Sequence, residues 1–103
     1  MRSKYKILYA PDVFDELKRI VDYYNNVSYG LGYRFKQGFL DAVEKLKNNP
    51  TYSSKRYDEV RFAVIKKFPY AAHYTVDEKN KTVKIQAVLG FKQNPDTNRR
   101  IRF

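Results

Sequence analysis

The stretch that decides the fold is VRFAVIKKFPYAAHYTVDEKNKTVKIQAVLG, residues 60–90. Side chains along it alternate between apolar and polar with a period of two, which indicates strands rather than a helix. Pro69 and the polar segment 77–81 divide it into strands at residues 60–68, 70–76 and 83–89. Because short connections join consecutive strands, we expect these three to form an antiparallel meander.

Alternation also assigns side chains to the two faces of this sheet. In the middle strand, His73 shares a face with Thr75, opposite Tyr74. In the last strand, strict alternation predicts one face that holds Val83, Ile85, Ala87 and Leu89.

The chain before residue 60 changes to a helical period. A short strand is predicted at residues 4–9, a first helix at 11–24 that Asn25 and Asn26 break, and a second helix from about 28–32 to 49. The short connection between the helices predicts an antiparallel hairpin, and residues 51–59 are expected to be a loop. The helical stripes are Val13, Leu17, Ile20, Val21 and Tyr24, then Leu31, Phe35, Phe39, Val43 and Leu46.

These elements predict an α+β fold in one domain spanning residues 1–103. An N-terminal short strand and a helix hairpin pack on a three- to four-stranded antiparallel sheet, and a basic C-terminal tail follows at 91–103. The length of 103 residues leaves room for one core.

Positive charge is concentrated in the second half of the chain. The formal net charge is +10, and residues 60–103 hold ten Lys and Arg against three Asp and Glu. Such a field attracts nucleic acid or an acidic protein. The chain has no cysteine and no apolar run long enough to span a bilayer, so we expect a cytoplasmic protein with no membrane contact, no metal and no cofactor.

Taken in order, the residues resemble the RelE/ParE toxin superfamily, in its ParE-like, plasmid-stabilisation branch. The pattern VR…V…FPY…Y.VD…V.I.AV over residues 60–88 carries the resemblance, and Tyr23-Tyr24, Ala42-Val43 and Asn49-Pro50 extend it upstream. The resemblance implies the toxin component of a type II toxin–antitoxin module. Its partner would be a cognate antitoxin that is acidic in its C-terminal half and folds on binding.

The resemblance leaves the target open. ParE-like members are associated with DNA gyrase, whereas RelE-like members cleave messenger RNA on the ribosome. We expect a ParE-like protein that acts by binding, and the alternatives are the ribosome-dependent RNase and a degenerate module that binds without toxicity. RelE-like nucleases usually carry a tyrosine near the C-terminus. Here no tyrosine follows Tyr74, and Asn98 stands near the expected place.

Two basic residues match basic positions of the family and are the candidates for catalysis or target binding. They are Arg61, where the meander begins, and Lys92, two residues after Gly90. Either could stabilise charge on a phosphate. Arg61 could instead pair with Asp58 or Glu59.

Other residues are candidates for contacts with partners. Arg99, Arg100, Arg102 and Phe103 extend the target-binding set into the tail, and Tyr23, Tyr29 and Tyr33 form a candidate antitoxin-binding surface. His73 is the only histidine. Since no second metal ligand or triad pattern accompanies it, we interpret His73 as a satisfied residue of the sheet.

Overall fold

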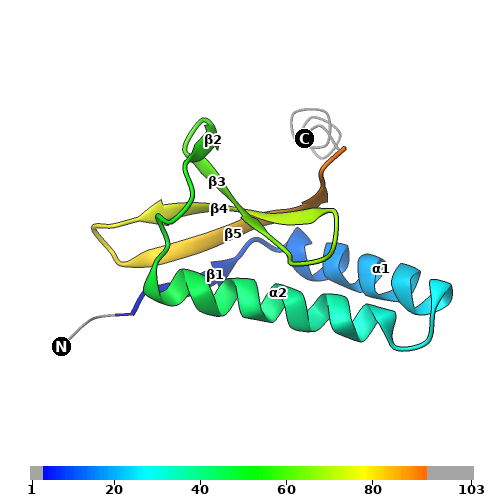
Figure 1. Ribbon diagram of the computed structural model, residues 1–103. Helices are drawn as coiled ribbons and strands as arrows, with labels where there is room; N and C mark the ends of the chain where they lie inside the picture. Colours follow the sequence, from blue (N-terminus) through cyan, green and yellow to red (C-terminus); the bar gives the residue numbers. More distant parts are fainter. Residues whose placement is uncertain (1–3, 93–103) are drawn as a thin grey trace.

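Two helices cover one face of a five-stranded mixed sheet in the computed structural model, which describes residues 4–92 (Figure 1). The strands lie in the order β1-β5-β4-β3-β2, and β1 runs parallel to β5 whereas the other neighbours are antiparallel. The elements are β1 (Lys6–Tyr9), α1 (Asp12–Val27), α2 (Leu31–Asn48), β2 (Lys55–Tyr57), β3 (Val60–Val64), β4 (Tyr70–Asp77) and β5 (Thr82–Gly90).

The predicted α+β class, the helix hairpin and the antiparallel meander are confirmed. The strand count differs, because residues 55–57 form β2 where a loop was predicted. β2 pairs with β3 at only two positions and shifts register between them, so it is too short to produce a periodic signal. β1 can pair in parallel with β5 because the helix hairpin and three strands separate them in the sequence, and parallel strands need such a long connection.

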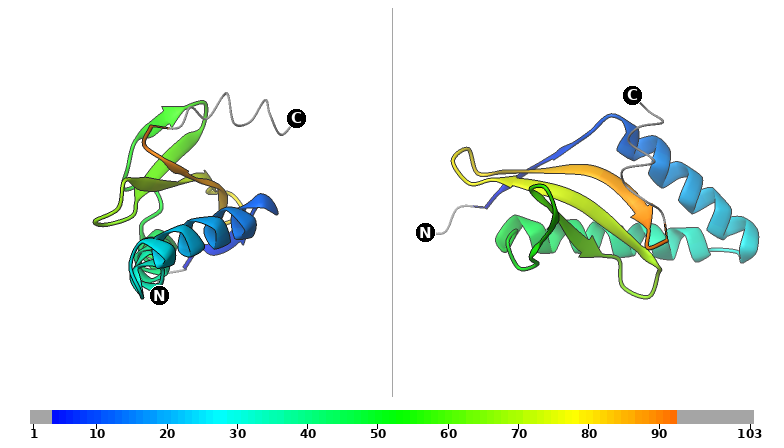
Figure 2. Two further views of the ribbon diagram at one scale, coloured as in Figure 1. Left: turned by 90° about the vertical axis from the view of Figure 1, so that its right-hand side faces the viewer. Right: turned by 90° about the horizontal axis from the view of Figure 1, so that it is seen from above.

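The core lies between the helix hairpin and the sheet, as the left view of Figure 2 shows. Aromatic rings fill the part of it nearest the helical turn, where the Phe68 ring centroid lies 5.0 Å from that of Tyr24 and 5.1 Å from that of Phe35. Burial of large aromatic side chains is a main source of stability in a chain of this size. The centre of the core is Val13, Ile20, Phe35, Phe39, Val43, Leu46, Ala63, Ile65, Ala72, Tyr74, Val83, Ile85 and Val88.

The segment between the two helices is shorter than the sequence predicts. The predicted break at Asn25 and Asn26 is wrong, since α1 continues to Val27. The Asn25 side chain accepts a hydrogen bond from the Gly32 amide at 2.7 Å, so it links the two helices instead of ending the first. Gly30 adopts a φ of 83° in the turn, a conformation that glycine adopts without steric cost.

A β-bulge in β5 overturns the predicted alternation of that strand. His73 pairs with Ala87 whereas Tyr74 pairs with Ile85, so Gln86 is an extra residue. Val88 therefore joins the core. The prediction that Ala87 and Leu89 share the face of Val83 and Ile85 is wrong.

The buried carboxylate of Glu16 fastens this bulge to α1. Its Oε1 accepts a hydrogen bond of 2.9 Å from the Val88 amide, and the residue is only 5% exposed. A carboxylate that accepts from a buried N–H makes a charge-assisted bond. Glu16 thus sets the position of β5 against the helix.

We expect Glu16→Ala to lower the free energy of unfolding by about 2 kcal/mol, because the Val88 amide loses its acceptor in a buried place. Glu16→Gln keeps an oxygen at this position and should lose less. Chemical denaturation followed by circular dichroism measures both variants. Equal midpoints for Glu16→Ala and the wild type would contradict the role given to this bond.

No helix within residues 4–92 is long and apolar enough to cross a membrane.

Candidate functional site

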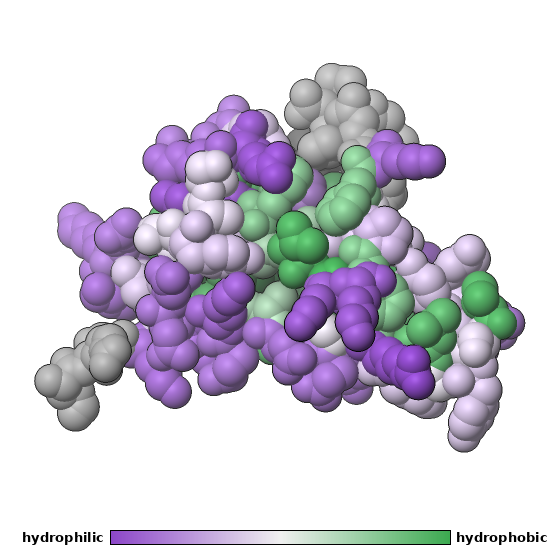
Figure 3. Space-filling model, viewed as in Figure 1, coloured by the Kyte–Doolittle hydropathy of each residue, from purple (hydrophilic) through white to green (hydrophobic). Residues whose placement is uncertain are grey.

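The face of the sheet turned away from the helices, here called the outer face, is left uncovered by helices (Figure 2). In the middle of the view in Figure 3, apolar atoms gather between hydrophilic ones. Phe62 and Val64 reach this face from β3, and His73 reaches it from β4. The bulge adds Leu89 from β5, which strict alternation would have placed on the helix side.

A hollow of about 340 Å³ lies on this face and is called the outer hollow. Its lining combines apolar side chains of the sheet with Arg56 from β2, Gly90 at the end of β5 and the aromatic Phe91 after it. A concave apolar surface with few polar groups is the usual form of a binding site in a small protein. The lining residues are Arg56, Phe62, Val64, Ala71, His73, Leu89, Gly90 and Phe91.

His73 forms part of an aromatic wall of the outer hollow. Its ring is stacked on that of Phe62 with the centroids 3.9 Å apart, and only 3% of the residue is exposed. Nδ1 shares a hydrogen bond of 3.1 Å with the Tyr57 hydroxyl. His73 is therefore a bonded residue of the sheet, in agreement with its interpretation from sequence, and it also supplies a π surface to the hollow.

Arg56 is a residue of the site that sequence reasoning missed. Its guanidinium lies 4.9 Å from the centroid of the Phe62 ring, in cation–π geometry, and it lines the outer hollow. The sequence signal for this residue is the pair Arg56-Tyr57, in which a cation stands next to an aromatic residue. It was missed because residues 51–59 were interpreted as a loop. The pairing of β2 with β3 brings Arg56 to the outer hollow.

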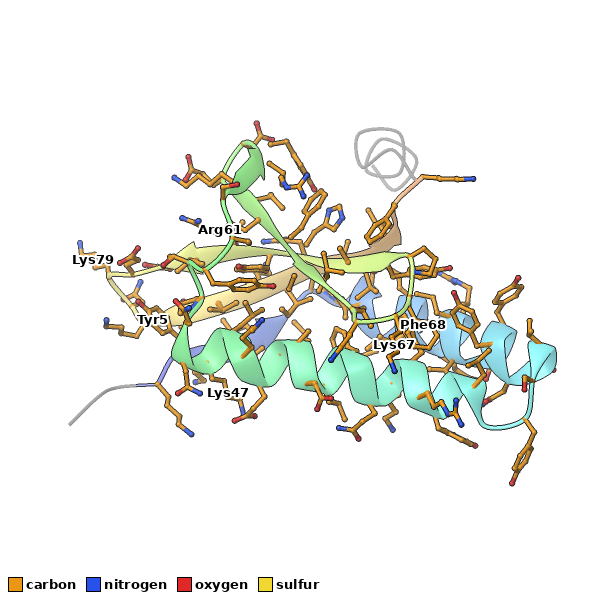
Figure 4. The ribbon with its side chains drawn as sticks, viewed as in Figure 1. Tyr5, Lys47, Arg61, Lys67, Phe68 and Lys79 are labelled. Carbon is orange, nitrogen blue, oxygen red and sulfur yellow. The ribbon has the colours of Figure 1, made fainter. Side chains whose placement is uncertain are left out.

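Arg61 holds a loop in place and does not line the outer hollow. It pairs in register with Tyr74, and its guanidinium donates to the carbonyl of Ser53. The carboxylate of Glu59, a predicted partner of Arg61, instead forms an ion pair of 2.7 Å with Lys55, and this hydrogen-bonded pair lowers the pKa of Glu59. Figure 4 labels Arg61 near the β2–β3 hairpin, well apart from Lys67.

Lys92 lines a neighbouring surface with Tyr23 and Tyr24, which shares Gly90 and Phe91 with the outer hollow. Lys92 comes two residues after Gly90, which pairs with Tyr70 of β4, whereas Arg61 pairs with Tyr74 of the same strand. Four residues along a strand span about 13 Å. The structure therefore does not bring the two predicted catalytic candidates together.

The three tyrosines predicted to bind an antitoxin are exposed at the end of the helix hairpin. Tyr29 in the turn is almost fully accessible, and Tyr23 and Tyr33 are more than half exposed. Tyr24 packs against the core, in agreement with the prediction. The tail candidates Arg99, Arg100, Arg102 and Phe103 lie outside the described residues.

The chemistry available in the outer hollow is recognition of a flat or apolar group beside an anion. The exposed ring of Phe91 can stack on such a group, and Arg56 can pair with a phosphate or carboxylate. Among residues 4–92, no three His, Cys, Asp or Glu side chains gather in a group that could hold a metal ion.

Comparison with solved structures identifies the fold. The chain is similar to the chromosomal ParDE toxin–antitoxin system from P. aeruginosa, with a TM-score of 0.71 and 16% identity over 84% of this chain and 96% of that one. It is also similar to the archaeal RelE–RelB complex from Pyrococcus horikoshii OT3, with a TM-score of 0.59 and 16% identity over 88% and 99% of the chains. The isolated E. coli RelE toxin gives a TM-score of 0.54 and 9% identity over 95% and 96%. No curated protein sequence matches at a significant level.

The helix hairpin on one face of a mixed sheet is thus a fold that this chain shares with solved RelE and ParE toxin structures. The model of the family described as the ParE toxin of the type II toxin–antitoxin system, parDE, matches residues 7–95. The chain belongs to this family and is a ParE-type toxin component of a toxin–antitoxin system.

Proposed function

We propose that this toxin acts by binding a type II topoisomerase such as DNA gyrase, within a plasmid-stabilisation module of the cytoplasm. Membership of the ParE family supports this target class. The observation that carries the choice of binding over catalysis is the position of Arg61. Its guanidinium is occupied by the Ser53 carbonyl, away from both Lys92 and the outer hollow.

The target-binding surface in this proposal combines residues from three parts of the chain. Arg61 and Lys92 belong to the described sheet and its end, and the tail supplies the rest. Their common charge suits an acidic surface or the DNA of a topoisomerase complex. The proposed residues of the tail are Arg99, Arg100, Arg102 and Phe103.

A cognate antitoxin neutralises the toxin in this proposal, through a C-terminal half that is acidic and folds on binding. Tyr23, Tyr29 and Tyr33 support such an interface because exposed tyrosines are frequent in protein contacts. The net charge of +10 favours an acidic partner.

We expect expression of this chain alone in a bacterium to stop growth, and co-expression of the neighbouring gene to restore it. The family assignment supplies the reason. Growth curves, with immunoblots that verify soluble expression, measure the effect. Normal growth at verified expression would contradict toxicity and favour the degenerate module that binds without poisoning.

Two assays on the same cells and purified protein distinguish the targets. A supercoiling and cleavage assay with purified gyrase should show inhibition or trapped cleavage, and primer extension on messenger RNA after induction should show no codon-phased cuts. Strong codon-phased cuts with unaffected gyrase would overturn the proposed target.

The second candidate function is a ribosome-dependent RNase, and the outer hollow is the observation that favours it. Phe91, an exposed ring in its lining, offers a stacking surface for a base, and Arg56 offers a cation for its phosphate. Against this function, no tyrosine follows Tyr74 in the sequence. Asn98, near the place expected for that tyrosine, cannot stack on a base or transfer a proton as tyrosine does. Arg56 and the hollow would then hold RNA.

A further inference from the structure

A second concave surface lies where the end of β5, which contacts α1, meets the turn before β4 (Figure 1). It is called the tyrosine cleft, and its volume is about 510 Å³. Aromatic rings and one proline form most of its lining, and a lysine is the one charged residue among the described residues that line it. These residues are Tyr23, Tyr24, Pro69, Tyr70, Gly90, Phe91 and Lys92.

Backbone hydrogen bonds fix the walls of the tyrosine cleft. The Phe91 amide donates to the Pro69 carbonyl at 2.9 Å, which fastens the segment after β5 to the turn before β4. Tyr70 pairs in register with Gly90, and its carbonyl accepts a hydrogen bond of 3.0 Å from the Ile65 amide. Because these backbone groups are already bonded, a ligand in the cleft would be recognised by side chains and not as an added strand.

The aromatic rings of the cleft are tilted against one another and remain accessible. Tyr23 is 59% exposed and Phe91 is 57% exposed. The ring of Tyr24 is inclined by 69° to that of Tyr23 and by 75° to that of Tyr70, with centroids 5.2 Å and 6.2 Å apart. Tilted rings form a ridged wall, which suits a ligand with its own ridges better than one flat ring.

Hydroxyl groups and one cation supplement this apolar wall. Burial raises the pKa of Tyr24, and the nearby Tyr70 and Tyr23 raise it further, so the Tyr24 hydroxyl keeps its proton. A protonated phenol can donate a hydrogen bond to a carbonyl. Lys92 is exposed, and none of the three ion pairs described within residues 4–92 involves it. The cleft therefore fits an apolar ligand that carries carbonyl groups and a negative charge.

We propose that the tyrosine cleft binds an extended, proline-containing segment of a partner protein, in the polyproline II conformation and with an acidic residue beside the prolines. Its proline rings would pack against Tyr23, Tyr70 and Phe91, since aromatic-lined grooves recognise such segments in other domains. The acidic residue would pair with Lys92. This interaction goes beyond the function proposed above.

The conformation of the ligand follows from the hydroxyl groups. A polyproline II segment makes no internal hydrogen bonds, so its carbonyls can accept from the hydroxyls of Tyr23 and Tyr70. A helix uses most of its carbonyls within itself and would leave these donors without acceptors. The tyrosine cleft thus favours an extended ligand over a helical one.

The test titrates the full chain, labelled with ¹⁵N, with a designed peptide of about nine residues, or roughly 28 Å as polyproline II. The peptide has proline at every third position and glutamate at both ends. One comparison peptide replaces each proline with alanine, and another replaces each glutamate with glutamine. Tyr23→Ala removes one wall of the cleft. Its matched control is Phe14→Ala, because Phe14 is an aromatic residue of the same helix with the same exposed fraction of 59%.

We expect the proline peptide to shift the amide signals of Tyr23, Tyr70 and Phe91. The Kd should rise about tenfold in Tyr23→Ala and change little in Phe14→Ala, as truncation of an aromatic anchor does at an interface. The alanine peptide should bind more weakly to the wild type, because it loses the rings and the preformed conformation. A spectrum with native dispersion verifies the fold of each variant.

The charge of Lys92 has a separate test. Lys92→Glu should weaken binding of the glutamate peptide, whereas the glutamine peptide should bind the wild type and this variant equally. Lys84→Glu is the matched control, with the same change in charge at an exposed position of β5. Equal weakening by the two variants would show that net charge, and not the cleft, attracts the peptide and would overturn the role of Lys92.

Three results would overturn the proposal as a whole: no shift at the cleft residues, equal binding of the alanine peptide, or equal weakening by Phe14→Ala. Equal shifts with a helical peptide of leucines and glutamates would identify an unselective apolar surface and also overturn it. Tighter binding of adenosine monophosphate at the same residues would reject a peptide site. These outcomes are independent of the growth and gyrase assays, so toxicity without peptide binding would leave the toxin assignment intact.

Discussion

Replacement of Gly32 by alanine is expected to lower the free energy of unfolding by about 3 kcal/mol or more, since overpacking against backbone is poorly relieved. Gly32 is buried where α2 passes α1. A Cβ there would meet the Val21 carbonyl oxygen directly and would lie 2.7 Å from Cγ of Asn25. Both atoms belong to α1, so the two helices would have to separate and the hydrogen bond from the Gly32 amide to Asn25 would stretch.

Gly30→Ala provides the matched control, two residues away in the turn before α2. Nothing lies within 4 Å of a Cβ at Gly30, and its φ of 83° is the only obstacle. The cost should be about 1 kcal/mol, which is typical of an L-residue held in the left-handed region. Urea denaturation of both variants tests the difference, and a Gly32→Ala variant no less stable than Gly30→Ala would contradict the close packing of the helices.

Tyr74→Ala is expected to destabilise the protein by about 4 kcal/mol, as large-to-small changes of buried aromatics do. Tyr74 is fully buried, and its hydroxyl donates to the Pro50 carbonyl at 2.6 Å. The same oxygen lies 3.1 Å from the Ser53 hydroxyl, which donates to it. Removal of the ring would leave a cavity between β4 and the loop after α2.

Tyr74→Phe separates the ring from the hydroxyl. It keeps the packing and leaves the Pro50 carbonyl without its donor, so a loss of about 1–2 kcal/mol is expected. Thermal and urea unfolding measure both variants. A loss in Tyr74→Phe as large as that in Tyr74→Ala would show that the hydroxyl, and not the ring, is the main contribution.

Alkaline pH gives a further readout of the Tyr74 hydroxyl. Burial raises its pKa above the ordinary value of 10.0, although the hydrogen bond with Ser53 opposes this shift. The unfolded chain therefore loses this proton first. The contribution to stability is complete below pH 10.0 and is lost as pH rises toward the raised pKa. Tyr74→Phe should lose less stability over this range than the wild type.

Periodic segments allowed most of the fold to be predicted from sequence. The stripe Leu31, Phe35, Phe39 has helical spacing along its whole length, and the meander alternates over many residues. β2 was missed because three residues carry no period, and the bulge at Gln86 was missed because it depends on pairing with β4 and on the distant carboxylate of Glu16. Both omissions come from tertiary contacts that local patterns do not encode.

The candidate site was less predictable for the same reason. Arg61 was predicted as a site residue from the resemblance, but its contact with the Ser53 carbonyl depends on the path of residues 49–57. Arg56 reaches the outer hollow through the pairing of β2, which sequence did not reveal. The interpretation of His73 as a satisfied residue of the sheet agrees with its bond to Tyr57, whereas its stack on Phe62 required the register of β3 against β4.

The coverage of the sheet by helices on one side only has a consequence for how such proteins diversify. Residues that hold the helices, such as Val83 and Ile85, face one way, and residues that line the outer hollow, such as Phe62 and Leu89, face the other. If the outer hollow binds a target, substitutions on the open face would alter recognition without changing the residues that hold the helices. Solved relatives with 9–16% identity keep this architecture. One scaffold can in this way acquire new targets while its folding requirements stay constant.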